Sequence, residues 1–376
     1  MSTVTGTTAN RRLRALSEAG VSVWLDQISR SLIAGGELAR LVAEQSLRGV
    51  TSNPAIFEKS ILGGGDYDSQ IAELASEGLD ADEIYDVIAV ADVQGAADVL
   101  ARVHAESGGT DGFVSIEVPP KLARDTDATL AAARRYWRAV DRPNIMVKIP
   151  GTPEGTPAIE QAIFEGININ VTLLFSVDAY AEIADAYIRG LERRHAQGLG
   201  LDVRSVASFF VSRVDTNVDR RLEALGAPPA LRGTAALANA RAAYARFHQI
   251  VAEPRWRLLQ GEGAAVQRPL WASTGIKNPA YPDTLYVDNL IAANTVNTMP
   301  PATLAAVADH GEVPGMTAEL DPSSELEALA AAGIDMHEVT DELLVDGIRL
   351  FKEAMDTLLA GIEKRRVDML GRSDGN

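Results

Sequence analysis

The stretch PNIMVKIPGT, residues 143–152, decides the fold class because it places a lysine inside a strand-forming run. Ile145, Val147 and Ile149 occupy every second position of this run. Met146 and Lys148 occupy the positions between them. Side chains alternate across a strand, so Lys148 faces away from those three residues. An ammonium group loses hydration in a core, which costs free energy. We therefore expect Lys148 to occupy a functional position, pointing inward near the C-terminal end of a strand.

Runs like this one recur along the chain and alternate with long, alanine-rich helical patterns. Strands followed by helices predict parallel pairing through right-handed crossovers. Eight such units predict an α/β fold, a closed (β/α)8 TIM barrel with additional helices. An open doubly wound sheet is the alternative architecture. The predicted strands are residues 21–29, 48–56, 111–119, 143–151, 169–176, 206–214, 269–276 and 293–300.

The remaining segments predict helices added to one barrel domain that spans residues 1–376. Residues 1–20 indicate a leading helix, and residues 215–265 a helical insertion with one break at LGAPPALRGT. The tail, roughly residues 317–371, ends in a long amphipathic helix. The sequence shows no internal repeat and no low-complexity linker, so we expect no second domain.

Composition narrows the classes of partner. The net charge is −17, from 35 basic and 52 acidic side chains, and such a surface repels nucleic-acid phosphates. Cysteine is absent, which excludes disulfides, thiolate metal sites and a thiol nucleophile. No run approaches the roughly 18 apolar residues of a membrane span, and the N-terminus lacks the apolar core of a signal peptide. We expect a cytoplasmic protein with no nucleic-acid or membrane partner.

Motifs for nucleotides and metals are also missing from the sequence. Neither a GxxxxGK[ST] loop nor a GxGxxG turn after a strand occurs. The five histidines show no HxH or HExxH spacing. We predict that the protein needs no metal and no cofactor.

Polar residues gather where the predicted strands end, which in a barrel is the catalytic rim. Each has an ordinary explanation taken alone, since a lysine can extend to solvent, a glutamate can form a salt bridge, and an aspartate or asparagine can cap a helix. Their occurrence together at the same end of different strands favours a site. These residues are Asp26, Asn53, Glu117, Lys148, Asn170 and Thr172.

The residue types match Schiff-base chemistry. Burial disfavours the charged form of an amine, and a neutral lysine can attack a carbonyl to form an iminium. The iminium accepts electrons when a neighbouring C–C bond breaks. Carboxylates must move protons on the substrate and on water, and Asp26 and Glu117 can do so. The amides and hydroxyls of the set can orient substrate and water.

Two later segments predict a phosphate site. SFFVSRV places Ser212 and Arg213 at the end of the sixth strand, and STGIKNP places Lys277 after the seventh. Loops after strands seven and eight often bind phosphate in barrels, and arginine suits bidentate phosphate contacts. The alternative is that Arg213 pairs with Asp215 or another carboxylate.

At this point the sequence resembles a known family. The runs SVWLDQISRSLI, GVTSNPAIF, VSIEVPP, NIMVKIPGT, INVTLLFS, SFFVSRVD and ASTGIKNP resemble transaldolase, in its longer bacterial form, in the order of that family. The resemblance extends from about residue 20 to 365. It implies a class I aldolase mechanism without a cofactor, in the non-oxidative pentose phosphate pathway. A dihydroxyacetone unit would pass from sedoheptulose 7-phosphate or fructose 6-phosphate to glyceraldehyde 3-phosphate or erythrose 4-phosphate.

The resemblance also implies catalytic roles. Lys148 matches the Schiff-base lysine, and Asp26 matches the acid/base that acts on the C4 hydroxyl. Glu117 and Thr172 match the pair that holds the catalytic water.

Substrate-binding roles follow in the same way. Asn53 and Asn170 match amides that contact the dihydroxyacetone unit, and Ser208 matches a hydroxyl near it. Arg213 matches a phosphate-binding arginine. Lys277 departs from the pattern, because many short transaldolases have arginine there; lysine keeps the charge and loses the bidentate geometry.

Two rival functions use the same scaffold. A lytic aldolase would release free dihydroxyacetone instead of transferring it. Whether an enzyme transfers or releases this unit depends on how well the enamine is protected from protonation. A non-catalytic sugar-phosphate-binding barrel would lack Lys148 or Asp26, and both are present. Both a monomer and a homodimer agree with the sequence.

Overall fold

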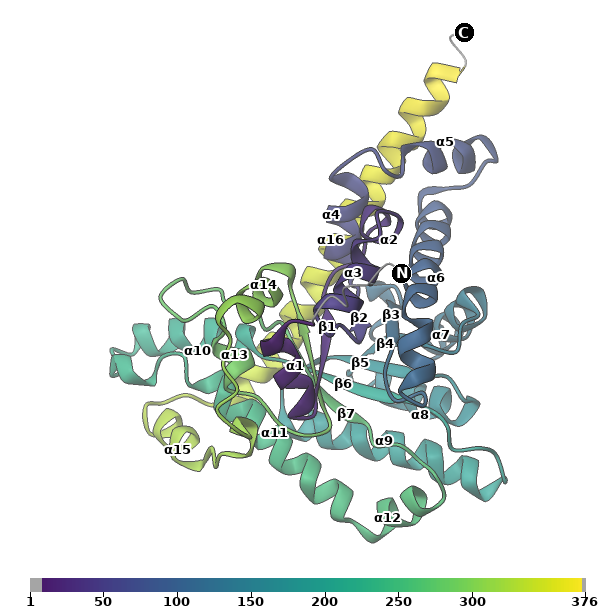
Figure 1. The fold of residues 1–376 in the computed structure, drawn as a ribbon. Helices are drawn as coiled ribbons and strands as arrows, with labels where there is room; N and C mark the ends of the chain where they lie inside the picture. The colour runs from purple at the N-terminus through teal and green to yellow at the C-terminus, as the bar shows by residue number, and fades with distance from the viewer. Residues whose placement is uncertain (1–8, 374–376) are drawn as a thin grey trace, which may run out of the picture.

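The computed structural model describes residues 9–373 and contains a closed barrel of parallel strands (Figure 1). Each strand pairs with the next one in sequence, and β1 closes the barrel by pairing with β8. The strands are β1 (Val21–Leu25), β2 (Gly49–Val50), β3 (Phe113–Glu117), β4 (Ile145–Pro150), β5 (Ile169–Leu174), β6 (Ser205–Phe210), β7 (Arg268–Ala272) and β8 (Thr295–Met299). The predicted α/β barrel is confirmed, and the open doubly wound sheet is wrong.

The expected strands begin at the right places but end too late, most clearly at β2. The sequence predicted a strand over residues 48–56, whereas the ladder covers Gly49–Val50 and a helix begins at Pro54. Proline is favoured in the first helical turn, and the preceding Asn53 caps that helix. A Cβ on Gly49 would lie 2.4 Å from the indole of Trp24, so glycine is required there.

Helices follow the strands and surround the barrel (Figure 1). The longer ones begin with side-chain caps: Asp80 and Glu83 form a capping box at α6, Asp125 caps α7 and Ser176 caps α9. The helices up to β5 are α1 (Arg11–Glu18), α2 (Arg30–Ala34), α3 (Glu37–Glu44), α4 (Pro54–Leu62), α5 (Asp68–Ser76), α6 (Ala81–Glu106), α7 (Thr126–Val140) and α8 (Gly155–Glu165), with the 3-10 turn η1 (Pro120–Leu122). Those after β5 are α9 (Val177–Ala196), α10 (Ser212–Ala224), α11 (Ala235–Ala252), α12 (Pro254–Gly261), α13 (Leu285–Asp288), α14 (Pro301–His310), α15 (Ser323–Ala331) and α16 (Met336–Ser373), with η2 (Pro229–Leu231) and η3 (Thr317–Glu319).

The added helices lie where the sequence placed them. α1 covers part of the predicted leading helix, whose first eight residues lie outside the described part of the chain. The insertion consists of α10, α11 and α12. α16 packs against α4, α5, α6 and α10 and reaches the end of β5. In Figure 1 its far half extends away from the barrel beside α4 and α5.

Strand register aligns the polar residues of neighbouring strands. Glu117 of β3 is paired in register with Lys148 of β4, and Lys148 with Asn170 of β5. Residues in register on parallel strands point to the same side of the sheet. These three side chains therefore form one layer, and each is at most 4% exposed.

Candidate active site

Lys148 lies at the centre of the polar layer. Its Nζ atom is 3.3 Å from Oε2 of Glu117 and donates a hydrogen bond of 2.9 Å to the carbonyl oxygen of Ser52, in the loop after β2. Ser52 is itself fixed, because its hydroxyl donates to the Ser115 carbonyl at 2.7 Å. Burial raises the pKa of Glu117 above its ordinary value, and the charge of Lys148 opposes that rise. The pair is therefore an amine beside a carboxyl group that retains its proton more readily than usual.

Asp26 follows β1 and is held by hydroxyl groups. Thr51 donates to Asp26 Oδ1 at 2.6 Å, and the Thr51 hydroxyl is 2.6 Å from that of Thr298. Burial raises the pKa of Asp26; the charge of Lys148 and the hydrogen bond from Thr51 lower it in part. Asp26 is thus a second carboxyl group with a raised pKa, which suits it to proton exchange, and it lies close enough to Lys148 for the charge of the lysine to affect it.

Asn170 is oriented by two hydroxyl groups. Its Nδ2 donates to Ser115 Oγ at 3.0 Å, and Ser208 Oγ donates to its Oδ1 at 2.7 Å. All three side chains are at most 2% exposed. This network assigns the amide orientation and connects β3, β5 and β6 in the barrel interior.

Thr172 lies next on β5 at an irregular point of the strand. Its hydroxyl oxygen is buried and has no hydrogen-bond partner among the described residues, and the same is true of both Glu117 carboxylate oxygens. The following residue, Leu173, has φ 59°, and the pairing of β5 with β6 shifts register between Val171 and Leu174. Left-handed backbone in a residue with a Cβ costs free energy, and such residues cluster at active sites.

Asn53 has the structural role that the sequence offered as its ordinary explanation. Its Oδ1 accepts a 3.0 Å hydrogen bond from Ile56 N and caps α4. Asn53 also lines a cavity of about 720 Å³ together with Asp26, Ser29 and Lys59. A capping oxygen leaves the amide nitrogen of Asn53 free to act as a donor toward that cavity.

The end of β6 leads into the predicted phosphate site. Ser212 begins α10; its Oγ lies 2.9 Å from that of Ser273, and its backbone nitrogen donates to the Ser273 carbonyl. Ser273 has φ 56°, which turns the chain sharply after β7. The site therefore combines a helix N-terminus with two hydroxyl groups, features that favour anions.

Arg213 lies in this site between aromatic rings. Its Cζ is 5.3 Å from the ring centre of Phe210 and 5.7 Å from that of Phe351, which belongs to α16. Its Nη1 is buried and has no hydrogen-bond partner in residues 9–373. Burial lowers the pKa of Arg213. The guanidinium is thus held by ring faces, which leave its N–H groups free to donate.

Asp215 does not pair with Arg213, so that part of the alternative is wrong. Among other carboxylates, Asp346 of α16 acts on Arg213 through its charge, which raises the Arg213 pKa against the lowering by burial. Asp215 accepts hydrogen bonds from Ala236 N and Tyr286 OH, both at 2.8 Å. Burial raises its pKa to about 7. One turn later, Asp219 accepts a 2.6 Å hydrogen bond from the hydroxyl of Tyr281. The two carboxyl groups hold the segment after β7 against α10.

Lys277 belongs to that held segment but is exposed, unlike the other predicted site residues. Its charge reaches Asp26, whose pKa it lowers slightly. The structure therefore places Lys277 at the outer edge of the site.

Several contributors escaped the sequence analysis. Thr51 and Ser52 lie inside the TSNPAI motif, and Ser273 begins STGIKNP, so proximity to those motifs was a usable signal. No such signal marks Phe351 of α16 in the sequence, because its contact with Arg213 joins segments far apart in the chain.

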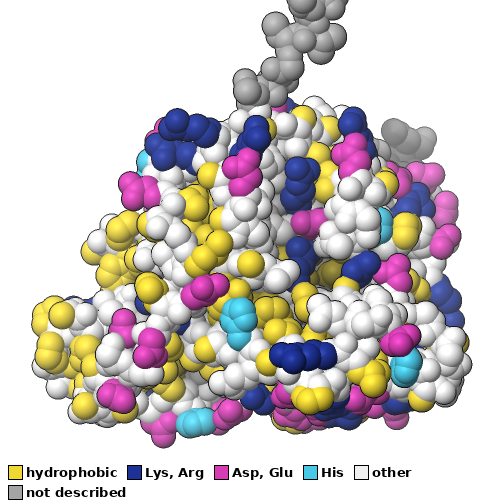
Figure 2. All heavy atoms as spheres, turned by 60° about the horizontal axis from the view of Figure 1, so that its bottom comes forward, with side chains coloured by type: hydrophobic (Ala, Val, Ile, Leu, Met, Phe, Trp, Pro, Cys, Tyr) yellow, Lys and Arg dark blue, Asp and Glu magenta, His cyan; other side chains and the backbone are white. Residues whose placement is uncertain are grey.

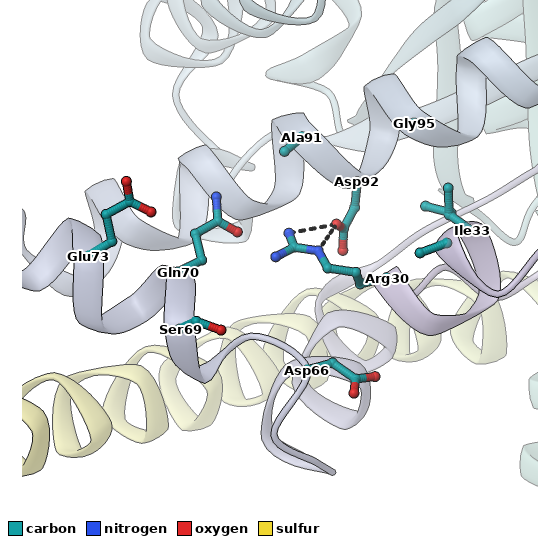
Figure 3. Close-up of a pocket in the computed structure, with 10 residues that line it drawn as sticks. Arg30, Ile33, Asp66, Ser69, Gln70, Glu73, Ala91, Asp92 and Gly95 are labelled. Atoms are coloured by element: carbon teal, nitrogen blue, oxygen red, sulfur yellow. Dashed lines mark hydrogen bonds and ion pairs between the residues drawn. The ribbon is translucent and has the colours of Figure 1, made fainter.

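A second hollow, of about 640 Å³, lies outside the barrel between α2, α5 and α6 (Figure 3). In it Arg30 donates to the buried Asp92 at 2.9 Å, and the hydroxyl of Tyr67 donates to the same carboxylate at 2.7 Å. These contacts hold the start of α2 and the residue before α5 against α6. None of the predicted site residues lines this hollow.

The surface and the helices limit other kinds of site. Figure 2 shows one face of the molecule, on which basic side chains are scattered among acidic ones. Within residues 9–373, no helix combines the length and apolar character needed to cross a bilayer. The same residues contain no group of three or more His, Asp or Glu side chains arranged to hold a metal ion.

Comparison with known proteins points to one family. The family model for Transaldolase/Fructose-6-phosphate aldolase matches residues 23–362. A transaldolase of Saccharopolyspora erythraea is 48% identical over 362 residues, which cover 95% of this chain and 98% of that protein. Transaldolase 1 of Streptomyces coelicolor is 50% identical, with 97% of each chain covered. A transaldolase of Thermobifida fusca is also 50% identical, over 92% of this chain and 96% of its own.

Proposed function

The chain belongs to the transaldolase/fructose-6-phosphate aldolase family, and we propose that Lys148 is the residue that carries its transaldolase reaction. The observation that supports this role is the position of the amine. Lys148 Nζ lies 3.3 Å from Glu117 inside a closed barrel, where the two side chains are 5% and 3% exposed. A buried ion pair is expensive to maintain and contributes little net stability, which favours a catalytic reason for its presence.

In the proposed reaction, the Lys148 amine adds to the C2 carbonyl of a ketose phosphate to give a carbinolamine. Loss of water leaves an iminium. Glu117, which retains a proton more readily than an ordinary glutamate, exchanges protons with that water, and Thr172 orients it.

Cleavage follows from the iminium. The C3–C4 bond breaks, its electron pair moves toward the iminium nitrogen to give an enamine, and Asp26 takes the proton of the C4 hydroxyl. The aldose phosphate leaves, and an acceptor aldehyde enters. The enamine attacks its carbonyl, Asp26 returns a proton to the new hydroxyl, and hydrolysis of the iminium frees the new ketose.

Substrate recognition is divided between two parts of the site. Asn53, Asn170 and Ser208 would hold the dihydroxyacetone unit near Lys148. Ser212 and Arg213 would bind the phosphate, with Lys277 contributing charge from the edge. The proposed substrates are sedoheptulose 7-phosphate or fructose 6-phosphate as donor and glyceraldehyde 3-phosphate or erythrose 4-phosphate as acceptor, in the cytoplasm. Whether the protein acts as a monomer or a homodimer stays a prediction.

Borohydride reduction in the presence of fructose 6-phosphate tests the proposal. Reduction converts the iminium into a stable amine, and peptide mapping locates the added mass. We expect the label on Lys148 and loss of activity. The matched control is Lys121→Ala, which removes an exposed lysine paired with Asp82 at 3.0 Å and should leave labelling unchanged. A label on Lys121 or Lys277, or full activity in Lys148→Ala, would show that the assignment is wrong.

A further inference from the structure

The last helix of the chain covers the arginine of the proposed phosphate site. Phe351 of α16 and Phe210 of β6 both face the Arg213 guanidinium, and their ring centres are 6.5 Å apart. Phe210 is fixed from the other side by Phe175, at 5.2 Å between ring centres. Arg213 therefore lies beside an aromatic cluster formed by β6, the residue that follows β5 and α16.

α16 approaches the barrel closely at one point. A Cβ on Gly347 would lie 2.9 Å from Leu173 Cδ2 and 3.7 Å from Arg213 Nη1. Glycine thus allows the helix to lie directly against the end of β5, and Phe351 follows one turn later on the same face. Without this close approach, the ring of Phe351 would stand farther from the guanidinium.

The contact holds Arg213 without consuming its hydrogen-bond donors. An aromatic face attracts a cation through its quadrupole but accepts no strong hydrogen bond. Nη1 of Arg213 is buried without a hydrogen-bond partner in the described part of the chain. Asp346 of α16 forms an ion pair with Arg349 at 3.2 Å, and its charge reaches Arg213, whose pKa it raises against the lowering by burial. The guanidinium is therefore oriented while remaining available to an anion.

We propose that Phe351 is a positioning residue for phosphate recognition, and that it acts by holding the Arg213 guanidinium against Phe210. This inference rests on the proposed function, because it takes Arg213 as the phosphate ligand. It makes α16 a determinant of specificity for phosphorylated sugars rather than only a structural helix. Phe351 touches neither the reacting carbon atoms nor Lys148.

Phe351→Leu and Phe351→Met test the proposal, since both keep an apolar side chain of similar size and remove the ring. Phe351→Tyr keeps the ring, and Met355→Leu changes a buried residue one turn along α16. The KM for fructose 6-phosphate should rise about 3- to 30-fold in the first two, the range that loss of a cation–π contact allows. The kcat should change less than twofold, and the tyrosine and Met355 variants should resemble the wild type.

Two further measurements separate this role from a general loss of structure. The reaction of dihydroxyacetone with glyceraldehyde involves no phosphate, and its KM should be unchanged in Phe351→Leu. Inorganic phosphate should stabilise the wild type against thermal unfolding, and its half-saturating concentration should rise about 3- to 30-fold in Phe351→Leu. Two results would overturn the proposal. One is an equal rise in KM for phosphorylated and unphosphorylated substrates in Phe351→Leu, and the other is a rise no larger than that in Met355→Leu.

Failure of the positioning role of Phe351 can be distinguished from failure of the proposed Schiff-base function. If borohydride does not label Lys148, the Schiff-base assignment fails, whereas phosphate binding still reports on Phe351. If Lys148 is labelled and phosphate binding is equal in all four variants, Phe351 has no positioning role.

Discussion

Lys148 Nζ and Glu117 Oε2 lie 3.3 Å apart in a barrel interior where each residue is 4% exposed. Removing either partner leaves the other charge buried and uncompensated. The two groups must therefore be tested by variants that keep polarity and shape. The same geometry separates two proton-transfer duties, because Glu117 adjoins the amine whereas Asp26 is held across the site by Thr51.

The first prediction concerns this division of labour. Asp26→Asn should still form an adduct with fructose 6-phosphate, because amine attack does not need Asp26. Cleavage should fail, so borohydride should trap the whole six-carbon donor. Turnover should fall about 100-fold or more, the usual effect of losing a positioned acid or base. Intact mass after reduction is the measurement.

Glu117→Gln should show the opposite defect. Formation of the adduct itself should be slow, because carbinolamine formation and dehydration need the proton that Glu117 exchanges. Asp98→Asn, which alters an exposed ion pair with Arg142, is the control for both variants. A three-carbon adduct forming at the normal rate in Asp26→Asn would require the two roles to be reassigned.

The second prediction concerns the pH dependence of activity. The Thr51 hydrogen bond lowers the pKa of Asp26, so Thr51→Val should raise it further. If the ionised carboxylate is needed, the acidic limb of the kcat profile should move to higher pH, because the lost hydrogen bond stabilised the charged form. Thr129→Val, at a buried threonine that bonds the Leu122 carbonyl, should leave the limb in place.

The third prediction concerns Arg213. A charge-assisted contact with phosphate is worth roughly 1.5–3 kcal/mol. Arg213→Ala should therefore raise the KM for fructose 6-phosphate by about 10- to 150-fold and affect dihydroxyacetone much less. Arg220→Ala removes an exposed arginine from the same helix and should change neither constant. Equal losses on both substrates would indicate a structural role for Arg213.

The fourth prediction concerns stability and Asp215. Its folded-state pKa is raised to about 7 by burial, from an ordinary value of 3.8. The unfolded chain therefore releases this proton first, and the free energy of unfolding should fall as pH rises from about 4 to 7, by up to about 1.4 kcal/mol per pH unit. Asp215→Asn should remove that fall and be more stable than the wild type at pH ~8. Urea unfolding at pH ~5 and ~8 measures the difference; an unchanged pH dependence would contradict the assignment.

The sequence predicted the barrel well because strand alternation is a local pattern. Lys148 was placed inward from the period of its own strand, and register aligns it in one layer with Glu117 and Asn170. The second strand was extended too far because Asn53 and Pro54 were taken as the end of a strand. They are a helix cap and a first helical residue, and this turn chemistry overrides the apolar pattern around them.

Other features were beyond reach of the sequence because they depend on contacts between distant segments. Arg213 was predicted to bind phosphate, but its aromatic surroundings require Phe351 from α16. The exposure of Lys277 is likewise a property of the folded segment after β7, which Asp219 holds through Tyr281, and the STGIKNP motif does not indicate it. Local patterns indicate which residues face inward, whereas tertiary packing decides how each is oriented.

The closure of β1 on β8 also has a consequence for synthesis of the protein. Asp26 follows the first strand, the barrel closes only when β8 pairs with it, and Phe351 reaches Arg213 only after that. A nascent chain that has emerged as far as β7 holds Lys148 and Glu117 on neighbouring strands but leaves two edges unpaired, and such edges promote aggregation. Closure of the barrel must therefore wait until β8 has left the ribosome, and the Phe351 contact with Arg213 forms only after α16 has followed.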